Sequence, residues 1–337
     1  MEEFKNIASN GNSHNKQNRI LRAKWMDYRS PSIMMVTIVT TKRLPLLGKL
    51  QGENIILTEL GQKVAEEIKR IPTYNGAESI EIYSYVIMPD HVHILLHIHE
   101  HLPRHVGYYI RWFKKQCTYI GLALAVPSAS DHSPLFAPDY HDSLLKGKNQ
   151  LPHLVRYIQD NPRRLALKRA NKDLFRIRQN QQIGTIQCTV LGNIFLIEHP
   201  LRQVLQCSRR LTQEQIDNLK ADCLREAADG TVSVTAAISE GEKQIARALR
   251  EAGFPLIILL EKGFPAPDDP HYNYFKPQGV YFEACAAGKL LLIEPHRDLL
   301  DREDIAVKTE AKVGHIPHDS QRYRFVAMNI LAEDICK

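Results

Sequence analysis

Three short segments in the first hundred residues have the hydrophobic pattern of β-strands. They are rich in Val, Ile and Thr, or they alternate apolar with polar residues. Only Pro89-Asp90 separates the last two segments, which predicts that they form an antiparallel hairpin. The expected strands are SIMMVTIVTT (32–41), SIEIYSYVIM (79–88) and HVHILLHI (91–98).

Helical patterns lie between and after these strands. Apolar residues recur at helical spacing after Thr58, a favourable N-cap residue. A later helix should end or kink at Asn161-Pro162, because proline disfavours a helical conformation in the residue before it. The order of elements predicts a ferredoxin-like α+β fold, an antiparallel sheet backed by helices, over residues 23–170. The expected helices are residues 58–72, 105–121 and 148–160.

The second half of the chain has a different pattern, in which short apolar strands alternate with helices. This alternation predicts an α/β domain with a mostly parallel sheet over residues 185–337. A polar tail at residues 1–22 should be disordered. The basic stretch at 163–182 is expected to be a linker helix or arm, and the linker proper is placed at 171–184. Strands are expected at 188–198, 231–238, 255–261 and 289–295, and helices at 213–228, 240–253 and 279–288.

Charge is distributed unevenly along the 337 residues. The net charge is +6, but residues 1–180 contain 26 Lys and Arg against 16 Asp and Glu, whereas residues 181–337 contain 18 against 22. A basic first half indicates that this part of the protein meets a polyanion. A solvated basic surface is the alternative.

Cysteine usage and hydropathy point to a cytoplasmic protein. The six cysteines form no CxxC pair, so neither a zinc knuckle nor a redox motif is indicated, and scattered cysteines suit a reducing compartment. No apolar run approaches the roughly 20 residues that span a bilayer. The N-terminus has no apolar core and is not a secretory signal.

Two histidines at alternate positions of the third strand are candidate metal ligands. His91 and His93 share a face, because side chains alternate across a strand, and two neighbouring imidazoles make half of a metal site. The other half is expected from a helix on which Tyr157 and Asn161 lie four residues apart. Asn161 offers a carbonyl oxygen and Tyr157 a phenol oxygen. Gln159 is a weaker alternative ligand.

A second pair with the same spacing, His97 and His99, is expected to have a surface role. Its position at the far end of the strand, without the preceding Met-Pro, argues against a catalytic one. Three other tyrosines rival Tyr157 as a reactive group: Tyr108, Tyr109 and Tyr140.

Three segments of the chain, taken in their order, resemble the REP-associated tyrosine transposases, which are members of the single-tyrosine HUH transposase superfamily. The segments are YVIMPDHVHILLHI, YHDSLL and LVRYIQDNPRR. The resemblance covers residues 25–170. It implies that His91, His93 and Asn161 bind Mg²⁺ or Mn²⁺ and that Tyr157 is the nucleophile. Two imidazoles suit Mn²⁺ better than Mg²⁺, and Zn²⁺ stays open.

The resemblance also implies the reaction and the partner. Tyrosine would attack a phosphorus of single-stranded or hairpin DNA, giving a 5′-phosphotyrosine and a free 3′-hydroxyl. A homodimer and a monomer are both compatible with such a family. A non-catalytic DNA-binding regulator, and an HUH replication initiator or relaxase, are the alternatives. A single matching tyrosine and the lack of a helicase P-loop favour the transposase.

Basic residues beside these motifs are candidate DNA contacts. Three of these basic residues lie on a helix that also carries four aromatic residues. We expect these aromatic side chains to pack within the protein rather than to stack on bases. They are Tyr108, Tyr109, Trp112 and Phe113. A solvated face is the alternative for each basic residue. The candidates are Arg111, Lys114, Lys115, Arg156, Arg163, Arg164 and Lys168.

The second half carries little catalytic signal. Ser239 and Glu242 have the spacing of a capping box at a helix start. Neither GxGxxG nor GxxxxGK[ST] occurs, so no nucleotide cofactor is indicated. ISEGEKQIARALREAGFPLIILLEKGF and YFEACAAGKLLLIEP are similar to the Rossmann-like domain of DNA-processing protein A. That resemblance implies an accessory module that binds DNA or a partner.

Overall fold

The computed structural model describes residues 27–126, 134–145, 150–184, 186–260, 263–264, 280–296, 302–318 and 320–337. Within it the chain forms two compact units, Met1–Ala166 and Leu167–Lys337. The tail expected to be disordered, residues 1–22, lies outside the described part.

The first unit is built on an antiparallel sheet with strand order β4-β5-β1-β6. β4 and β5 are joined through Met88, Pro89 and Asp90 and pair antiparallel, which confirms the predicted hairpin. A bulge interrupts β4 between Ile82 and Ser84, and the side chain between them, Tyr83, is exposed. Two short strands form a separate antiparallel pair. The strands are β1 (Ser32–Val39), β2 (Gly48–Gln51), β3 (Asn54–Leu57), β4 (Ile80–Ile87), β5 (His91–Ile98) and β6 (His141–Leu144).

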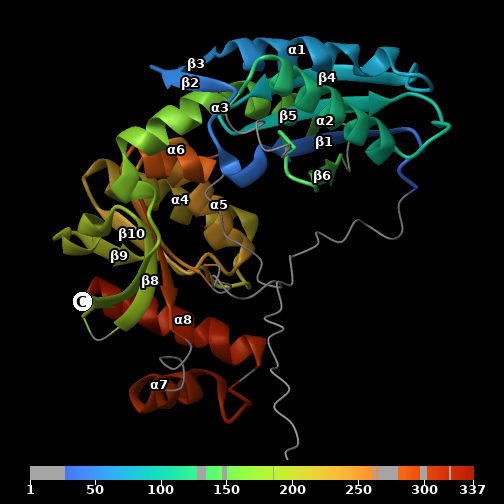
Figure 1. Ribbon diagram of the computed structural model, residues 1–337. Helices are drawn as coiled ribbons and strands as arrows, with labels where there is room; N and C mark the ends of the chain where they lie inside the picture. The colour runs from blue at the N-terminus through green and yellow to red at the C-terminus, as the bar shows by residue number, and fades with distance from the viewer. Residues whose placement is uncertain are drawn as a thin grey trace, which may run out of the picture. The chain divides into compact units, whose positions relative to one another are not determined.

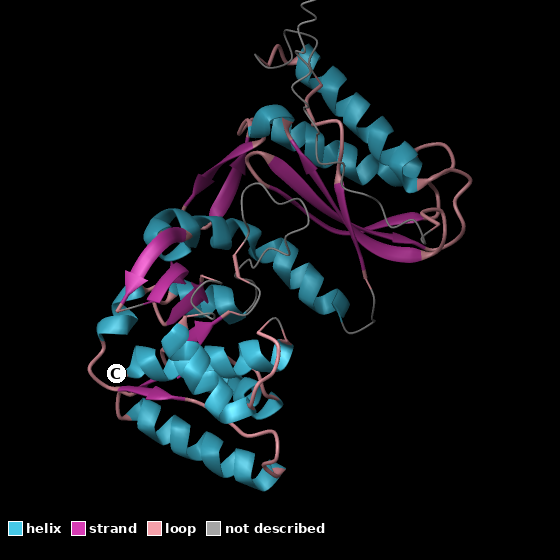
Figure 2. Ribbon diagram, turned by 90° about the horizontal axis from the view of Figure 1, so that it is seen from below, coloured by secondary structure: helices cyan, strands magenta, loops and turns pink. Residues whose placement is uncertain are grey.

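Alternation along β5 decides what each face of this sheet contacts. The even-numbered residues from Val92 to Ile98 are fully buried in one apolar cluster with α1 (Glu59–Arg70) and α2 (Val106–Ala123). Both helices therefore cover this face (Figures 1 and 2). The side chain of Thr58 accepts a hydrogen bond from the amide of Gly61, as expected for the N-cap of α1. The odd-numbered residues, the histidines among them, point to the opposite face.

The third helix, α3 (Leu151–Ala170), continues through Pro162, contrary to the predicted end or kink at this point. Pro162 has no N–H to donate to the carbonyl of Ile158. The side-chain amide of Asn161 donates to the carbonyl of Tyr157 at 2.7 Å and lies 3.4 Å from that of Ile158. A local side-chain donor thus replaces part of the bonding that proline removes.

The second unit contains a mixed, mostly parallel sheet with order β7-β8-β12-β11-β10-β9. β9 to β12 run parallel, whereas β8 pairs antiparallel with both β12 and β7. Residues 178–183, expected to lie in a linker, instead form β7 of this sheet. The strands are β7 (Arg178–Ile183), β8 (Ile186–Gly192), β9 (Arg202–Val204), β10 (Val232–Thr235), β11 (Leu256–Leu259) and β12 (Leu290–Pro295).

Helices cover both faces of this second sheet, in two separate apolar clusters. One cluster joins the sheet to α4 (Gln213–Ala228), α5 (Glu240–Glu251) and α6 (Val280–Ala286). The other joins it to α7 (Glu303–Val313) and α8 (Gln321–Cys336), two helices that the sequence did not predict. All six cysteines are free thiols.

Candidate metal and nucleophile site

His91 and His93 lie side by side at the start of β5, as the alternation predicts. Their ring centroids are 4.8 Å apart, with the rings nearly perpendicular. His93 is buried, with 7% of its surface exposed, whereas His91 is half-buried. The pair therefore presents one accessible and one enclosed imidazole.

Each of these imidazoles has a partner for Nδ1. Asp90 places Oδ1 2.7 Å from Nδ1 of His91, and the hydroxyl of Thr37 lies 2.8 Å from Nδ1 of His93. The His91 hydrogen bond holds the pKa of the Asp90 carboxyl below its usual range. In the tautomers in which Nδ1 donates, both Nε2 atoms carry the lone pair that a metal needs. Outer partners of this kind orient metal-binding histidines.

Burial and neighbouring charge keep His93 neutral. The pKa of His93 is lowered to about 4. Burial is the largest cause, the neighbouring His91 is the second, and His141 also contributes. A neutral imidazole at physiological pH is the form that binds metals.

Tyr157 reaches this histidine pair from α3. Its ring centroid lies 6.1 Å from that of His93, in an edge-to-face arrangement. The guanidinium of Arg164 lies over the same tyrosine, 5.5 Å from the ring centroid. Asp160 holds Arg164 through a 2.9 Å hydrogen bond and also binds Arg163. The tyrosine therefore has both an imidazole and a positive charge beside it.

Asn161 follows Tyr157 by one helical turn, but its amide nitrogen is engaged with the carbonyl of Tyr157. Its oxygen is the atom that remains for a metal. Of the rival tyrosines, Tyr109 is fully buried and Tyr140 nearly so, whereas Tyr108 is exposed. All three are distinct from the tyrosine that contacts the histidines.

His141 also lies at this site, although the sequence did not indicate it. In the sheet it stands opposite Thr37 from one side, while His93 stands opposite Thr37 from the other. The three side chains thus form one row across β5, β1 and β6, on one face. His141 is exposed, and it contributes to the lowered pKa of His93. The signal was present in YHDSLL, but the pairing of β6 with β1 is needed to place it.

The candidate DNA contacts fall into two groups. Arg111 and Lys115 are exposed on α2, which covers the sheet face opposite the histidines. Lys114, on the same helix, donates to the carbonyls of residues 137 and 138. Trp112 and Tyr119 are exposed beside Lys115, whose ammonium lies 5.7 and 5.6 Å from their ring centroids.

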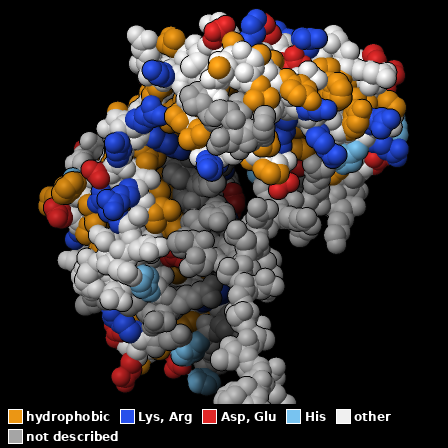
Figure 3. Space-filling view, viewed as in Figure 1, with side chains coloured by type: hydrophobic (Ala, Val, Ile, Leu, Met, Phe, Trp, Pro, Cys, Tyr) orange, Lys and Arg blue, Asp and Glu red, His pale blue; other side chains and the backbone are white. Residues whose placement is uncertain are grey.

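The second group belongs to α3. Arg156 is exposed next to Tyr157, Arg163 and Arg164 bind Asp160, and Lys168 lies 5.8 Å from the ring centroid of Phe282. On the face seen in Figure 3, Lys and Arg side chains are mixed with exposed hydrophobic ones.

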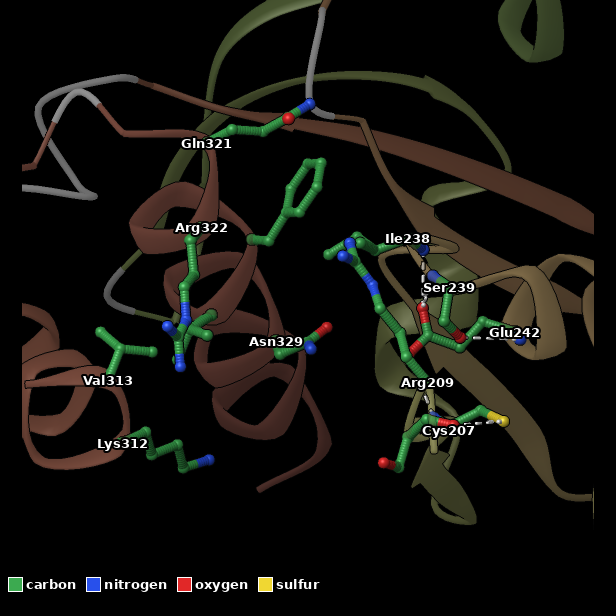
Figure 4. Close-up of a pocket in the computed structure, with 13 residues that line it drawn as sticks. Cys207, Arg209, Ile238, Ser239, Glu242, Lys312, Val313, Gln321, Arg322 and Asn329 are labelled. Carbon is green, nitrogen blue, oxygen red and sulfur yellow. Dashed lines mark hydrogen bonds between the residues drawn. The ribbon is translucent and has the colours of Figure 1, made fainter. Parts of the chain in front are cut away.

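A cavity of about 500 Å³ lies in the second unit, next to the N-terminus of α5. Ser239 and Glu242 form the capping box that the sequence predicts. The Glu242 carboxylate, 2% exposed, accepts hydrogen bonds from the amides of Cys207, Ile238 and Ser239. Figure 4 shows these bonds. The amides that could bind a phosphate here are already occupied by this carboxylate.

No family model matches the chain. An uncharacterized protein of Haemophilus influenzae is 24% identical over 164 residues, which is 43% of this chain and 87% of that protein. A solved REP-associated tyrosine transposase bound to a REP hairpin is 19% identical, covering 43% of this chain and 74% of its own, with a TM-score of 0.32. A candidate transposase from Deinococcus radiodurans is also 19% identical, covering 41% and 96%, with a TM-score of 0.28. Each of these two solved structures matches less than half of this chain.

Among the helices of the described residues, none combines the length and the apolar character needed to cross a membrane.

Proposed function

We propose that the first unit is a metal-dependent DNA transposase or nickase that cleaves and rejoins single-stranded, hairpin-containing DNA. The observation that carries this proposal is the approach of Tyr157 to the pair formed by His91 and His93. These residues come from a helix and a strand that are far apart in the sequence. A phenol beside two oriented imidazoles is the combination of nucleophile and ligands that metal-assisted phosphoryl transfer uses.

The residues present fit a divalent cation. Nε2 of His91, Nε2 of His93 and the side-chain oxygen of Asn161 would hold the ion, because the other polar atoms of these side chains have partners within the chain. Mn²⁺ or Mg²⁺ is proposed, and the two nitrogen ligands favour Mn²⁺. When bound, the ion supplies positive charge that polarises the scissile phosphate.

Tyr157 acts as the nucleophile of the proposed reaction. Its oxygen forms a bond to phosphorus while the bond between phosphorus and the 3′ oxygen breaks. The phenol proton passes to solvent, and the departing 3′ oxygen takes up a proton. The DNA is left as a 5′-phosphotyrosine with a free 3′-hydroxyl. Attack of a 3′-hydroxyl on this ester rejoins a strand and restores the phenol.

Arg164 stabilises charge in this step. Its guanidinium lies over the Tyr157 ring and is held by Asp160, so it meets the developing negative charge without first having to be ordered. Arg156, exposed on the same helix, is proposed to bind a DNA phosphate beside the attacked one.

The decisive experiment looks for the covalent intermediate. The full chain is incubated with Mn²⁺ and labelled single strands that contain a hairpin, and protein–DNA adducts are separated under denaturing conditions. Tyr157→Phe should abolish the adduct and retain DNA binding. Tyr119→Phe, which removes the hydroxyl of an exposed tyrosine on α2, should leave the adduct unchanged. An adduct that persists in Tyr157→Phe excludes this nucleophile. DNA binding by the wild type without any adduct would instead support a non-catalytic DNA-binding regulator.

A further inference from the structure

The second histidine pair of β5 lies next to a carboxylate on the neighbouring strand. Glu81 of β4 stands directly opposite His97 in the antiparallel pairing. His99 follows Ile98, the last residue of β5, and its ring lies beside that of His97. Three potential metal ligands therefore come from β4, from β5 and from the residue just after β5.

The three side chains are close together. Oε2 of Glu81 is 2.8 Å from Nε2 of His99 and 3.8 Å from Nδ1 of His97. The two imidazole centroids are 3.9 Å apart. Each residue offers one ligand atom within 4.8 Å of the others, and in the described part of the chain no other three His, Cys, Asp or Glu residues do so.

One of the nitrogen atoms lacks a hydrogen-bond partner. Nδ1 of His97 is buried and makes no hydrogen bond, although its closest carboxylate oxygen is 3.8 Å away. A buried polar atom without a partner costs free energy, and a bound ion is one of the ordinary reasons for it. A cation between this nitrogen and the Glu81 carboxylate would satisfy both groups.

We propose that Glu81, His97 and His99 bind a divalent transition-metal ion of the zinc class. Two imidazole nitrogens and one carboxylate oxygen are ligands that Zn²⁺ accepts, with bonds of about 2.0–2.2 Å, and water fills the open position. Such bonds place ligand atoms at most about 4 Å apart, so the site closes by a small movement. The side chains of Glu81 and His99 are 51% and 48% exposed and free to make that movement.

This site is separate from the one at His91 and His93. About 3.3 Å of strand rise per residue puts His97 roughly 13 Å from His93, and the fully buried Leu95 lies between them. Because β4 is at the edge of the sheet formed by the described strands, the ion would cross-link this strand to β5, beside which it pairs. Its role is therefore to stabilise this edge of the first unit, independently of DNA cleavage.

Zinc titration in a chain that lacks the first site tests the proposal. The untagged full chain with His91→Ala and His93→Ala is titrated with Zn²⁺ by calorimetry and with Co²⁺ by visible absorption. One equivalent should bind, and adding Glu81→Gln or His99→Gln should weaken its affinity at least about tenfold. A hundredfold excess of Zn²⁺ over the dissociation constant should raise the unfolding midpoint by roughly 5–10 °C. Circular dichroism without metal checks that each variant folds.

Two controls separate this site from other surface histidines. His101→Gln removes an exposed imidazole that is paired with Asp27, and it should leave the zinc equivalent in place. His315→Gln with His318→Gln removes the pair beside Glu310 in the second unit and should also have no effect. The proposal is overturned if either control variant loses the bound equivalent of Zn²⁺. It is also overturned if that equivalent survives when Glu81→Gln, His97→Ala and His99→Gln are combined.

Discussion

The ring of Tyr157 lies 6.1 Å, centroid to centroid, from the ring of His93, and the guanidinium of Arg164 lies over the same tyrosine, 5.5 Å from its ring centroid. This arrangement depends on α3 continuing past Pro162, because Arg164 follows the proline and Tyr157 precedes it. If the helix ended at Asn161, the positive charge and the phenol would separate. Continuity of α3 is therefore part of the proposed active site.

Arg164→Gln should slow formation of the covalent adduct by about 10- to 100-fold, because it removes the positive charge that lies over the Tyr157 ring. DNA affinity should change much less. Arg163→Gln is the matched control, since Arg163 also donates to Asp160. Single-turnover cleavage at saturating DNA measures both variants. Equal slowing by the two would show that Asp160 pairing, and not charge at the tyrosine, is what matters.

Thr37→Val should weaken metal binding at the first site by about 10- to 100-fold, because the His93 ring loses the partner that fixes its orientation. Asp90→Asn should act similarly through His91. Mn²⁺ affinity, measured by calorimetry in a Glu81→Gln background, reports the effect. Unchanged affinity in both variants would argue that these histidines do not bind the ion through Nε2.

The lowered pKa of His93 predicts an acid-sensitive stability of the metal-free protein. The folded state binds this proton more weakly than the unfolded chain, whose His titrates near 6.5. The unfolded state therefore holds more protons below about pH 6.5. The contribution of His93 is complete above that pH and is lost as pH falls toward about 4. The size of the shift corresponds to about 3 kcal/mol.

Urea unfolding of the first unit in chelator, at several pH values between about 4 and 7, measures this dependence. His93→Gln should have a flatter profile, because it has no group to titrate there. A slope that is identical in the two proteins would assign the acid sensitivity to other groups, such as Asp90.

Glu242→Ala should destabilise the second unit by about 2–4 kcal/mol. Its carboxylate accepts hydrogen bonds from three backbone amides, two of which come just before the start of α5. All three amides would lose this buried hydrogen-bond partner. Ser239→Ala, which removes one capping bond, should cost only about 1 kcal/mol. Chemical denaturation of both variants compares the two losses. A Glu242→Ala variant as stable as the wild type would mean that water replaces the carboxylate.

Local patterns in the sequence determined the strands, their faces and several caps. Alternation along β5 placed His91 and His93 together, and the short link with Pro89-Asp90 indicated the hairpin. Both inferences depend only on backbone geometry and on the period of the side chains. Thr58 and Ser239 cap their helices for the same local reason. The strand and helix alternation of the second half likewise predicted its mostly parallel sheet.

Only the tertiary structure decided how distant segments meet. β7 has no apolar alternation and becomes a strand because β8 offers it a hydrogen-bonding edge. α8 is buried along much of its surface, so its sequence lacks a clear amphipathic pattern. His141 enters the site through pairing of β6 with β1, and Asn161 compensates for Pro162 through a contact visible only in the folded helix. Side-chain period is a property of neighbours in the chain, whereas these relationships depend on packing between residues that the chain itself keeps far apart.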